Sequence, residues 1–202
     1  HFTDAAAPDV RAALEAAATQ LERAGAVVDE VNLTQVTHVG PASAAIVASE
    51  ALAYHAAWMR SRPQDYQADV RERLRMGAFV NGAQYVRAQQ IRALVAREID
   101  EALARRDVLL APATPLAAPV LGERETTLGD GPSDVRAALL RCTRPFNLSG
   151  HPACAAPCGF TAGGLPVGLQ IVGRPFDEAT VLRVVDAYQR TTDWHTRRPT
   201  AA

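Results

Sequence analysis

Apolar residues recur every three or four positions in several stretches of the chain, and this period predicts amphipathic helices. The first stretch covers 8–24, with Val10 and Leu14 on one face and Gly25 just after its end. Asp177 stands where a capping residue would begin a closing helix. Similar patterns predict the other helices at 42–60, 65–76, 82–106 and 177–190, with one or two helical turns at 135–142.

Shorter apolar runs between these helices predict strands. They lie at 26–33, 107–111 and 167–172. Val167 and Ile171 belong to the last run, which glycines bound on both sides and which suits a strand buried on both faces. A helix, a glycine and a short strand in succession is a frequent α/β element, and the chain begins with that order.

Prolines and glycines interleave through 143–176, where they restrict backbone angles at some positions and permit positive φ at others. This pattern indicates the edge of a buried active site. Upstream of it, 112–134 is rich in Pro, Gly and Thr, and we expect a loop near the pocket mouth that is the most mobile part of the chain.

Composition narrows the function classes. The chain has 202 residues, 48% of them hydrophobic, which is enough for one domain with a sizeable core. A net charge of −1 without clustered basic residues argues against nucleic acid and anionic membrane as partners. The chain also lacks a long apolar run and a signal-peptide pattern, so a cytoplasmic location is the default. It begins at His1 rather than Met, which suggests a truncated or partly recorded polypeptide.

The three cysteines are an odd set without the second Cys or His pair that a zinc site needs. Buried thiols are the simpler interpretation, and no metal site is expected. The cysteines are Cys142, Cys154 and Cys158.

Four segments carry a resemblance to a known family. They read APATPLAAP at 111–119, NLSGHPA at 147–153, APCG at 156–159 and GLPVGLQIVGRPFDE at 164–178. Together they resemble the C-terminal part of the amidase signature family, which includes amide hydrolases and amidotransferase A subunits. The resemblance implies an α/β fold with a mixed β-sheet flanked by helices over 1–202, and catalysis without a metal or organic cofactor.

The family's catalysis resembles a Ser, cis-Ser, Lys relay in which a neutral lysine takes the proton of the nucleophile. All 21 basic residues here are arginines, and a guanidinium cannot act as a neutral base near pH 7. The five serines are scattered singly, without a GSSGGS-like loop. We therefore expect no catalytic residue in this chain, which should be inactive alone, and the catalytic group in an N-terminal half of the same enzyme.

Substrate-binding candidates follow from the resemblance. Arg73 matches an arginine that faces the substrate carboxylate in the amidotransferase branch, although it also lies in a charge run typical of a solvated helix face. Leu140 stands where that branch has an acid for the glutamine ammonium, and Ser43 lies where it has a tyrosine. Both changes point to an apolar pocket. Phe146 could line that pocket or pack in the core, and His151 lacks a neighbouring acid in sequence to orient it as a base.

These observations predict part of an amidase that cleaves a small, apolar carboxamide, with this chain supplying core and pocket wall. The expected partners are the amide substrate and the N-terminal half, and a homodimer is left open. One alternative is a non-catalytic binding subunit or scaffold. A weaker one is the A subunit of a tRNA-dependent amidotransferase, against which Leu140 argues because it cannot accept hydrogen bonds from an ammonium.

Overall fold

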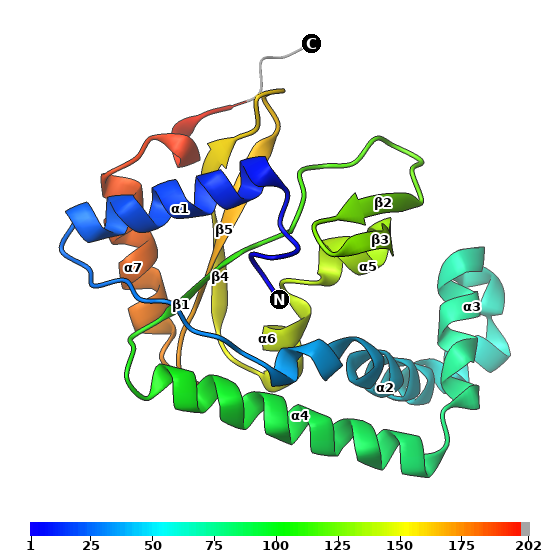
Figure 1. Cartoon of the computed structure of the whole chain (residues 1–202). Helices are drawn as coiled ribbons and strands as arrows, with labels where there is room; N and C mark the ends of the chain where they lie inside the picture. The colour runs from blue at the N-terminus through cyan, green and yellow to red at the C-terminus, as the bar shows by residue number, and fades with distance from the viewer. Residues whose placement is uncertain (199–202) are drawn as a thin grey trace.

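The computed structural model describes residues 1–198 and shows helices packed on both faces of a small sheet, with a separate hairpin beside it (Figure 1). The helices and strands are α1 (Pro8–Arg23), α2 (Val39–Ser61), α3 (Ala68–Met76), α4 (Gly82–Leu103), β1 (Leu109–Pro112), β2 (Glu125–Leu128), β3 (Gly131–Asp134), α5 (Val135–Leu140), α6 (Arg144–Ser149), β4 (Ala153–Phe160), β5 (Pro166–Val172) and α7 (Glu178–Arg190). Short 3₁₀ turns include η1 (Gln35–His38) before α2, η3 (Gly77–Phe79) after α3 and η4 (Trp194–Thr196) after α7.

The main sheet has the strand order β1-β5-β4, with β5 in the centre. Helices flank this sheet, so the fold is α/β as expected. Both strand pairings are antiparallel, and the described strands form no parallel pair. The connection from β4 to β5 is a short turn, and a short turn can join only antiparallel neighbours. β5 is buried along nearly its whole length, as its apolar sequence predicts.

One face of this sheet is covered by α1 and α7. Val167, Leu169 and Ile171 point to this face because side chains alternate along a strand, and they form a core cluster with Val10 and Tyr188 of the two helices. The opposite face meets α2, α4 and α6. Val172 belongs to that second cluster, which extends away from the sheet between the long helices.

Side-chain caps fix where several helices begin. Asn81 accepts a hydrogen bond from the backbone N–H of Gln84, whose side chain in turn accepts from the backbone N–H of Asn81, and this capping box starts α4. Asp177 accepts from the N–H of Thr180 at the start of α7, which confirms the predicted cap.

The predicted strand at 26–33 is wrong. The segment is irregular, and Val27 is 96% exposed. A strand needs a neighbour for its backbone N–H and C=O groups, and none of the described strands pairs with this segment.

The prediction of a loop over 112–134 is corrected at its C-terminal end, where β2 and β3 pair as an antiparallel hairpin. Gly129 and Asp130 form its two-residue turn, a loop length typical of hairpins. A Cβ on Gly129 would lie 2.1 Å from the carbonyl oxygen of Asp4, so glycine lets the hairpin meet the N-terminal segment. Pro132 and the glycines weaken the strand signal in the sequence, which explains the error.

Within residues 1–198, none of the helices combines the length and the apolar character that crossing a membrane requires.

Candidate functional site

The proline- and glycine-rich block folds into α6, β4 and β5. Pro145 lies in the first turn of α6, where its missing N–H costs nothing, and Gly150 ends the helix with a φ of 87°. The sequence did not predict this short helix. It turns Phe146 inward and leaves Asn147 exposed.

Phe146 is a core residue in this structure. It is 2% exposed and belongs to the cluster between α2, α4 and β1. Phe2 stacks on it with the ring centroids 5.5 Å apart and the planes 10° apart. In this chain Phe146 therefore packs in the core, and the N-terminal segment covers its ring.

Ser43 and Leu140 lie close to the same contact between helices. Ser43 is half-buried in the first turns of α2, next to Ala42 of the Phe146 cluster. Leu140 is the last residue of α5 and is half-buried, a few residues before α6 begins. Because α2 contacts α6, which begins four residues after Leu140, three of the four candidates lie near the start of α2 and the connection from α5 to α6.

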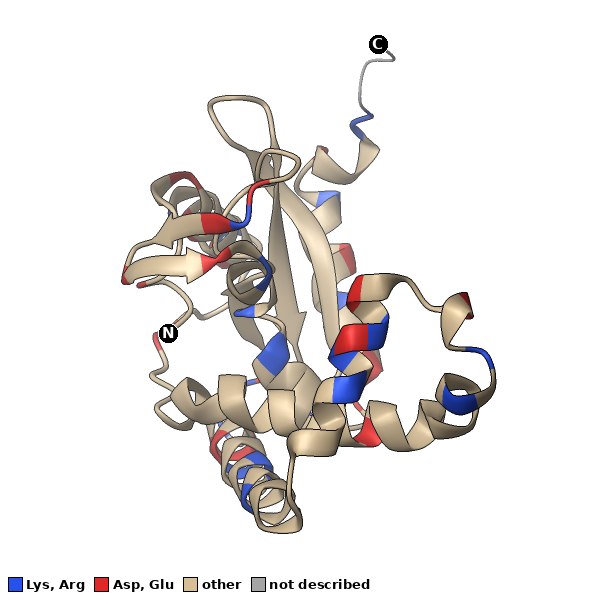
Figure 2. Ribbon diagram, turned by 90° about the vertical axis from the view of Figure 1, so that its right-hand side faces the viewer, with Lys and Arg blue, Asp and Glu red and all other residues tan. Residues whose placement is uncertain are grey.

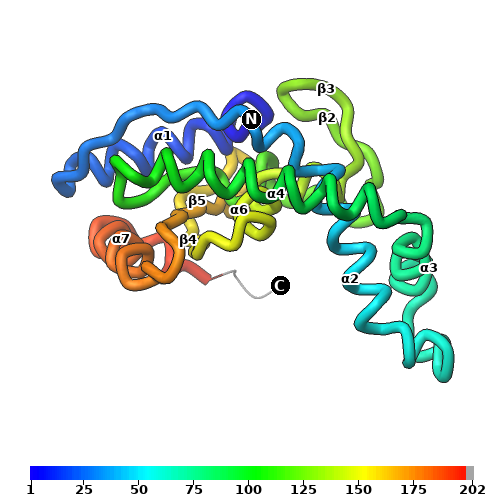
Figure 3. The backbone as a smooth tube through the Cα atoms, turned by 90° about the horizontal axis from the view of Figure 1, so that it is seen from below, coloured from blue at the N-terminus to red at the C-terminus, as the bar shows by residue number. Residues whose placement is uncertain are grey.

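Arg73 is separate from the other three. It belongs to α3, and Figures 1 and 3 show this helix at the outer end of α2, away from the sheet. Its guanidinium pairs with Asp69 one turn earlier, and its side chain is 45% exposed. α3 carries both basic and acidic residues (Figure 2). Arg73 therefore lies in a charge run on a solvent-exposed helix.

His151 does have an acidic partner, from a distant part of the chain. Its Nε2 lies 3.2 Å from Oδ1 of Asp100 on α4, and its Nδ1 lies 2.8 Å from Oγ of Ser149. The imidazole side chain is 1% exposed. This line of Ser, His and Asp joins α4 to the end of α6, and the buried ring offers a substrate no approach, so we assign it a structural role.

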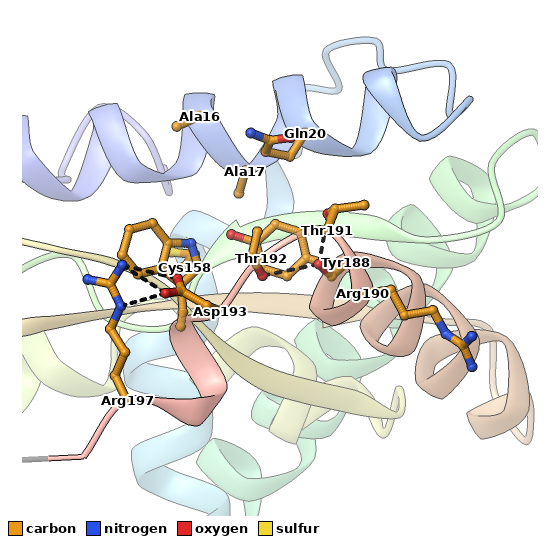
Figure 4. Close-up of a pocket in the computed structure, with 11 residues that line it drawn as sticks. Ala16, Ala17, Gln20, Cys158, Tyr188, Arg190, Thr191, Thr192, Asp193 and Arg197 are labelled. Carbon is orange, nitrogen blue, oxygen red and sulfur yellow. Dashed lines mark hydrogen bonds and ion pairs between the residues drawn. The ribbon is translucent and has the colours of Figure 1, made fainter.

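A cavity of about 570 Å³ opens between α1, α7 and η4 (Figure 4). Gln20 lines it from α1, Tyr188 from α7 and Cys158 from β4. Arg197 closes one end, where it pairs with Asp193 at 3.1 Å and lies 4.2 Å over the ring of Trp194. The cavity lies on the α1 and α7 face, so it is separate from the candidate residues near α2 and α6.

The chemistry of this cavity does not suit catalysis. Burial raises the pKa of Cys158 to about 11. Burial is also the main cause that raises the pKa of Tyr188 to about 12, and the electrostatic effect of the nearby Cys158 is the second. Both groups therefore stay protonated at neutral pH and supply neither a thiolate nor a base.

A shallower hollow of about 330 Å³ lies between α2 and the start of α4. Glu50 lines it and accepts a hydrogen bond from the hydroxyl of Tyr85 at 2.8 Å, while Gln89 donates to the same hydroxyl at 2.9 Å. The carboxylate thus joins α2 to α4. Ser49 also lines the hollow, and its buried Oγ has no hydrogen-bond partner among the described residues.

The cysteines are free thiols, and Cys142 and Cys158 are buried as expected, whereas Cys154 is only half-buried. Cys142 is fully buried, and burial raises its pKa to about 12. Residues 1–198 contain no cluster of three or more His, Cys, Asp or Glu side chains arranged to hold a metal ion.

Arg144 is a residue that sequence reasoning missed. It begins α6 and is half-buried, and its Nη1 lies 3.8 Å from the position that a Cβ on Gly40 would take. The signal was a charged residue, one of two in the proline- and glycine-rich block 143–176, directly between Thr143 and Pro145.

Comparisons with known proteins define the class. The profile of the Amidase family matches residues 1–182. An amidase of Pseudomonas putida is 38% identical over 98% of this chain and 43% of its own length. The A subunit of the glutamyl-tRNA(Gln) amidotransferase of Chloroflexus aggregans is 39% identical over 100% of this chain and 45% of its own length.

Solved structures agree. A chain of an inhibitor-bound vestigial protein complex, described as revealing the evolutionary origins of an s-triazine catabolic enzyme, has a TM-score of 0.86 at 30% identity over 98% of this chain and 42% of its own. A crystal structure of an amidase has a TM-score of 0.82 at 32% identity over 92% of this chain and 42% of its own. The fold is therefore that of part of a known amidase structure. The chain belongs to the Amidase family, and it spans less than half the length of these relatives.

Proposed function

We propose that this chain forms the sheet, helices and pocket wall of an amide hydrolase whose Ser, cis-Ser and Lys residues lie in an N-terminal half. The observation that carries the proposal is the family match over 1–182 in a chain that contains no lysine. The relatives extend well beyond the matched region, which leaves room for the catalytic half. In this proposal the chain alone does not turn over substrate.

The proposed substrate is a small carboxamide with an apolar acyl group. Leu140, Phe146 and Ser43 would form the wall, because the fold gathers them near the start of α2 and none of them is charged. Phe2 would have to move or be replaced by substrate for the Phe146 ring to be reached. Arg73 would contact substrate only if it left Asp69.

A chimera tests the function. The N-terminal part of the P. putida amidase, up to the region that this chain matches, is joined to residues 1–202. We expect the chimera to release ammonia from simple aliphatic carboxamides and to react with a fluorophosphonate, whereas the 202-residue chain does neither. Labelling of a serine in the isolated chain would contradict the proposal. Ser149 is the serine to examine first, because its Oγ contacts His151. A folded chimera without activity would contradict it as well.

Two alternatives have separate support. A scaffold or binding subunit fits a chain that covers less than half of its relatives, and a well-behaved monomer in sedimentation together with an inactive chimera would favour it. The A subunit of an amidotransferase fits several relatives by name, and ammonia release from glutamine by the chimera would favour it in spite of Leu140. The cytoplasmic location and the homodimer stay predictions.

A further inference from the structure

The five half-buried arginines of the chain differ in whether their guanidinium groups have a bonding partner. Four of them bond to carbonyl or carboxylate oxygens: Arg71 to Pro63, Arg106 to Asp29, Arg141 to Asp130 and Arg174 to Leu103. The fifth, Arg144, forms no hydrogen bond or ion pair with any residue in 1–198. A guanidinium carries five donors, and burial without acceptors is costly, so this exception calls for a partner outside the described residues.

The surroundings of Arg144 are positive. Burial, and then the charge of Arg136 on α5, lower the pKa of Arg144. Arg136 is exposed and also forms no ion pair among the described residues. The guanidinium of Arg144 lies beside Gly40 in the first turn of α2, where the dipole of that long helix adds positive potential. The guanidinium groups of Arg144 and Arg136 and the N-terminus of α2 therefore converge, and neither arginine pairs with an acidic side chain among residues 1–198.

The position relates this group to the candidate wall. Leu140 lies one turn after Arg136 on α5, on the same side of the helix. Ser43 lies one turn after Gly40 on α2. Arg144 is thus at the charged end of a wall that is otherwise apolar and uncharged.

We propose that Arg144, assisted by Arg136, is a carboxylate-binding site at the junction of α2, α5 and α6. A carboxylate suits the planar guanidinium because two N–H groups can bind its two oxygens together. The carboxylate comes either from the far end of an otherwise apolar acyl group of the substrate or from an acidic side chain of the N-terminal half. This choice rests on the proposed function, but the existence of the site does not.

Direct binding to the 202-residue chain tests the site. Protein labelled with ¹⁵N-arginine is titrated with sodium succinate, against sodium chloride at matched ionic strength. We expect the Nε–H resonance of Arg144 to shift saturably with succinate only. R144Q should abolish the saturable shift, R144K should weaken binding because lysine lacks the two-pronged geometry, and R136Q should weaken it about tenfold.

The matched control is R190Q. Arg190 is exposed and paired with Asp186 at 2.8 Å one turn away on α7, so its loss should leave succinate binding unchanged. Circular dichroism confirms that each variant is folded, and R144K keeps the test valid if R144Q does not fold. The proposal is overturned if succinate and chloride give the same shifts, or if a folded R144Q or R144K variant binds as the parent does.

Two further ligands identify the source of the carboxylate. Succinamate carries a carboxamide as well as a carboxylate, whereas N-acetylaspartate methylamide imitates an acidic side chain. Binding of succinamate about tenfold tighter than the aspartate derivative would assign the site to substrate. Equal binding would assign it to an acidic side chain of the N-terminal half. Because the readout is binding, failure here leaves the amide-hydrolase proposal standing, and an inactive chimera leaves this one standing.

Discussion

The two faces of the β1-β5-β4 sheet differ in how completely this chain covers them. On the first face, α1 and α7 bury Leu169 and Ile171 to 0% exposure. On the second, the helices cover β1 and the end of β5, but Ala153 and Ala155 of β4 are exposed. These alanines pair with Val172 and Gln170, so they share the second face.

The residues on the two faces differ in size, and this difference follows from how well each face is covered. Large aliphatic side chains gain free energy only where partner atoms surround them, and the first face supplies these from its own two helices. Small alanines on the open part of the second face leave little apolar area in water. The first face is therefore an autonomous core, while the second suits close approach by another layer of protein.

The largest effect should come from the covered face. Leu169→Ala removes a fully buried side chain in the centre of β5, and we expect a loss of about 2–5 kcal/mol in the free energy of unfolding. Chemical denaturation followed by circular dichroism measures it. Ala155→Ser on the open face is the control and should be nearly neutral. Similar losses in both variants would erase the contrast between the faces.

A buried polar contact should give an intermediate effect. Gln170 is 4% exposed and donates from Nε2 to the carbonyl of Cys142 at 3.1 Å, which joins β5 to the connection before α6. Gln170→Met keeps the volume but leaves that carbonyl without its donor, at a cost of about 1–3 kcal/mol. An unchanged midpoint in urea would mean that the carbonyl finds another donor.

The open part of the second face should tolerate a long charged side chain in the isolated chain. Ala155→Arg is expected to change the free energy of unfolding by less than about 0.5 kcal/mol, because the arginine can extend into water. In the chimera the same change should abolish ammonia release, since the added half would meet the guanidinium. Full activity of the folded A155R chimera would show that this face stays uncovered.

The smallest effect concerns the thiols. With a pKa of about 11, only about one Cys158 side chain in a thousand is a thiolate near pH 8, and Cys142, with a pKa of about 12, is ionised even less. Iodoacetamide should therefore modify Cys154 first, since it is only half-buried. Peptide mass spectrometry measures the order, and labelling of Cys142 or Cys158 should accelerate as the pH rises towards those values.

The long helices were predictable because their apolar positions repeat with one period and glycine or proline marks their ends. The period of 8–24, for example, reproduces α1 to within a residue. β5 was predictable for a related reason, since glycines flank a short run that is mostly aliphatic. The errors at 26–33 and 125–134 concern strands, whose existence depends on partners distant in sequence or on a two-residue turn.

The candidate site was predictable only in part. Family resemblance named Leu140, Ser43 and Phe146, and the fold gathers them near α2 and α6. It could not show that Phe2 stacks on Phe146, because that contact joins residues far apart in sequence. Arg144 was missed for the same kind of reason, since the lack of an acceptor becomes visible only when every neighbour has a position.

β4 has β5 on one side and no described strand on the other. Pro157 and a bulge at Pro157/Gly159 interrupt that outer edge, but the stretch before them still presents backbone N–H and C=O groups in a row. Two copies can join through such edges, so protein concentration rather than temperature should limit how long a solution of this chain stays clear. A short synthetic strand that caps the edge should extend that time.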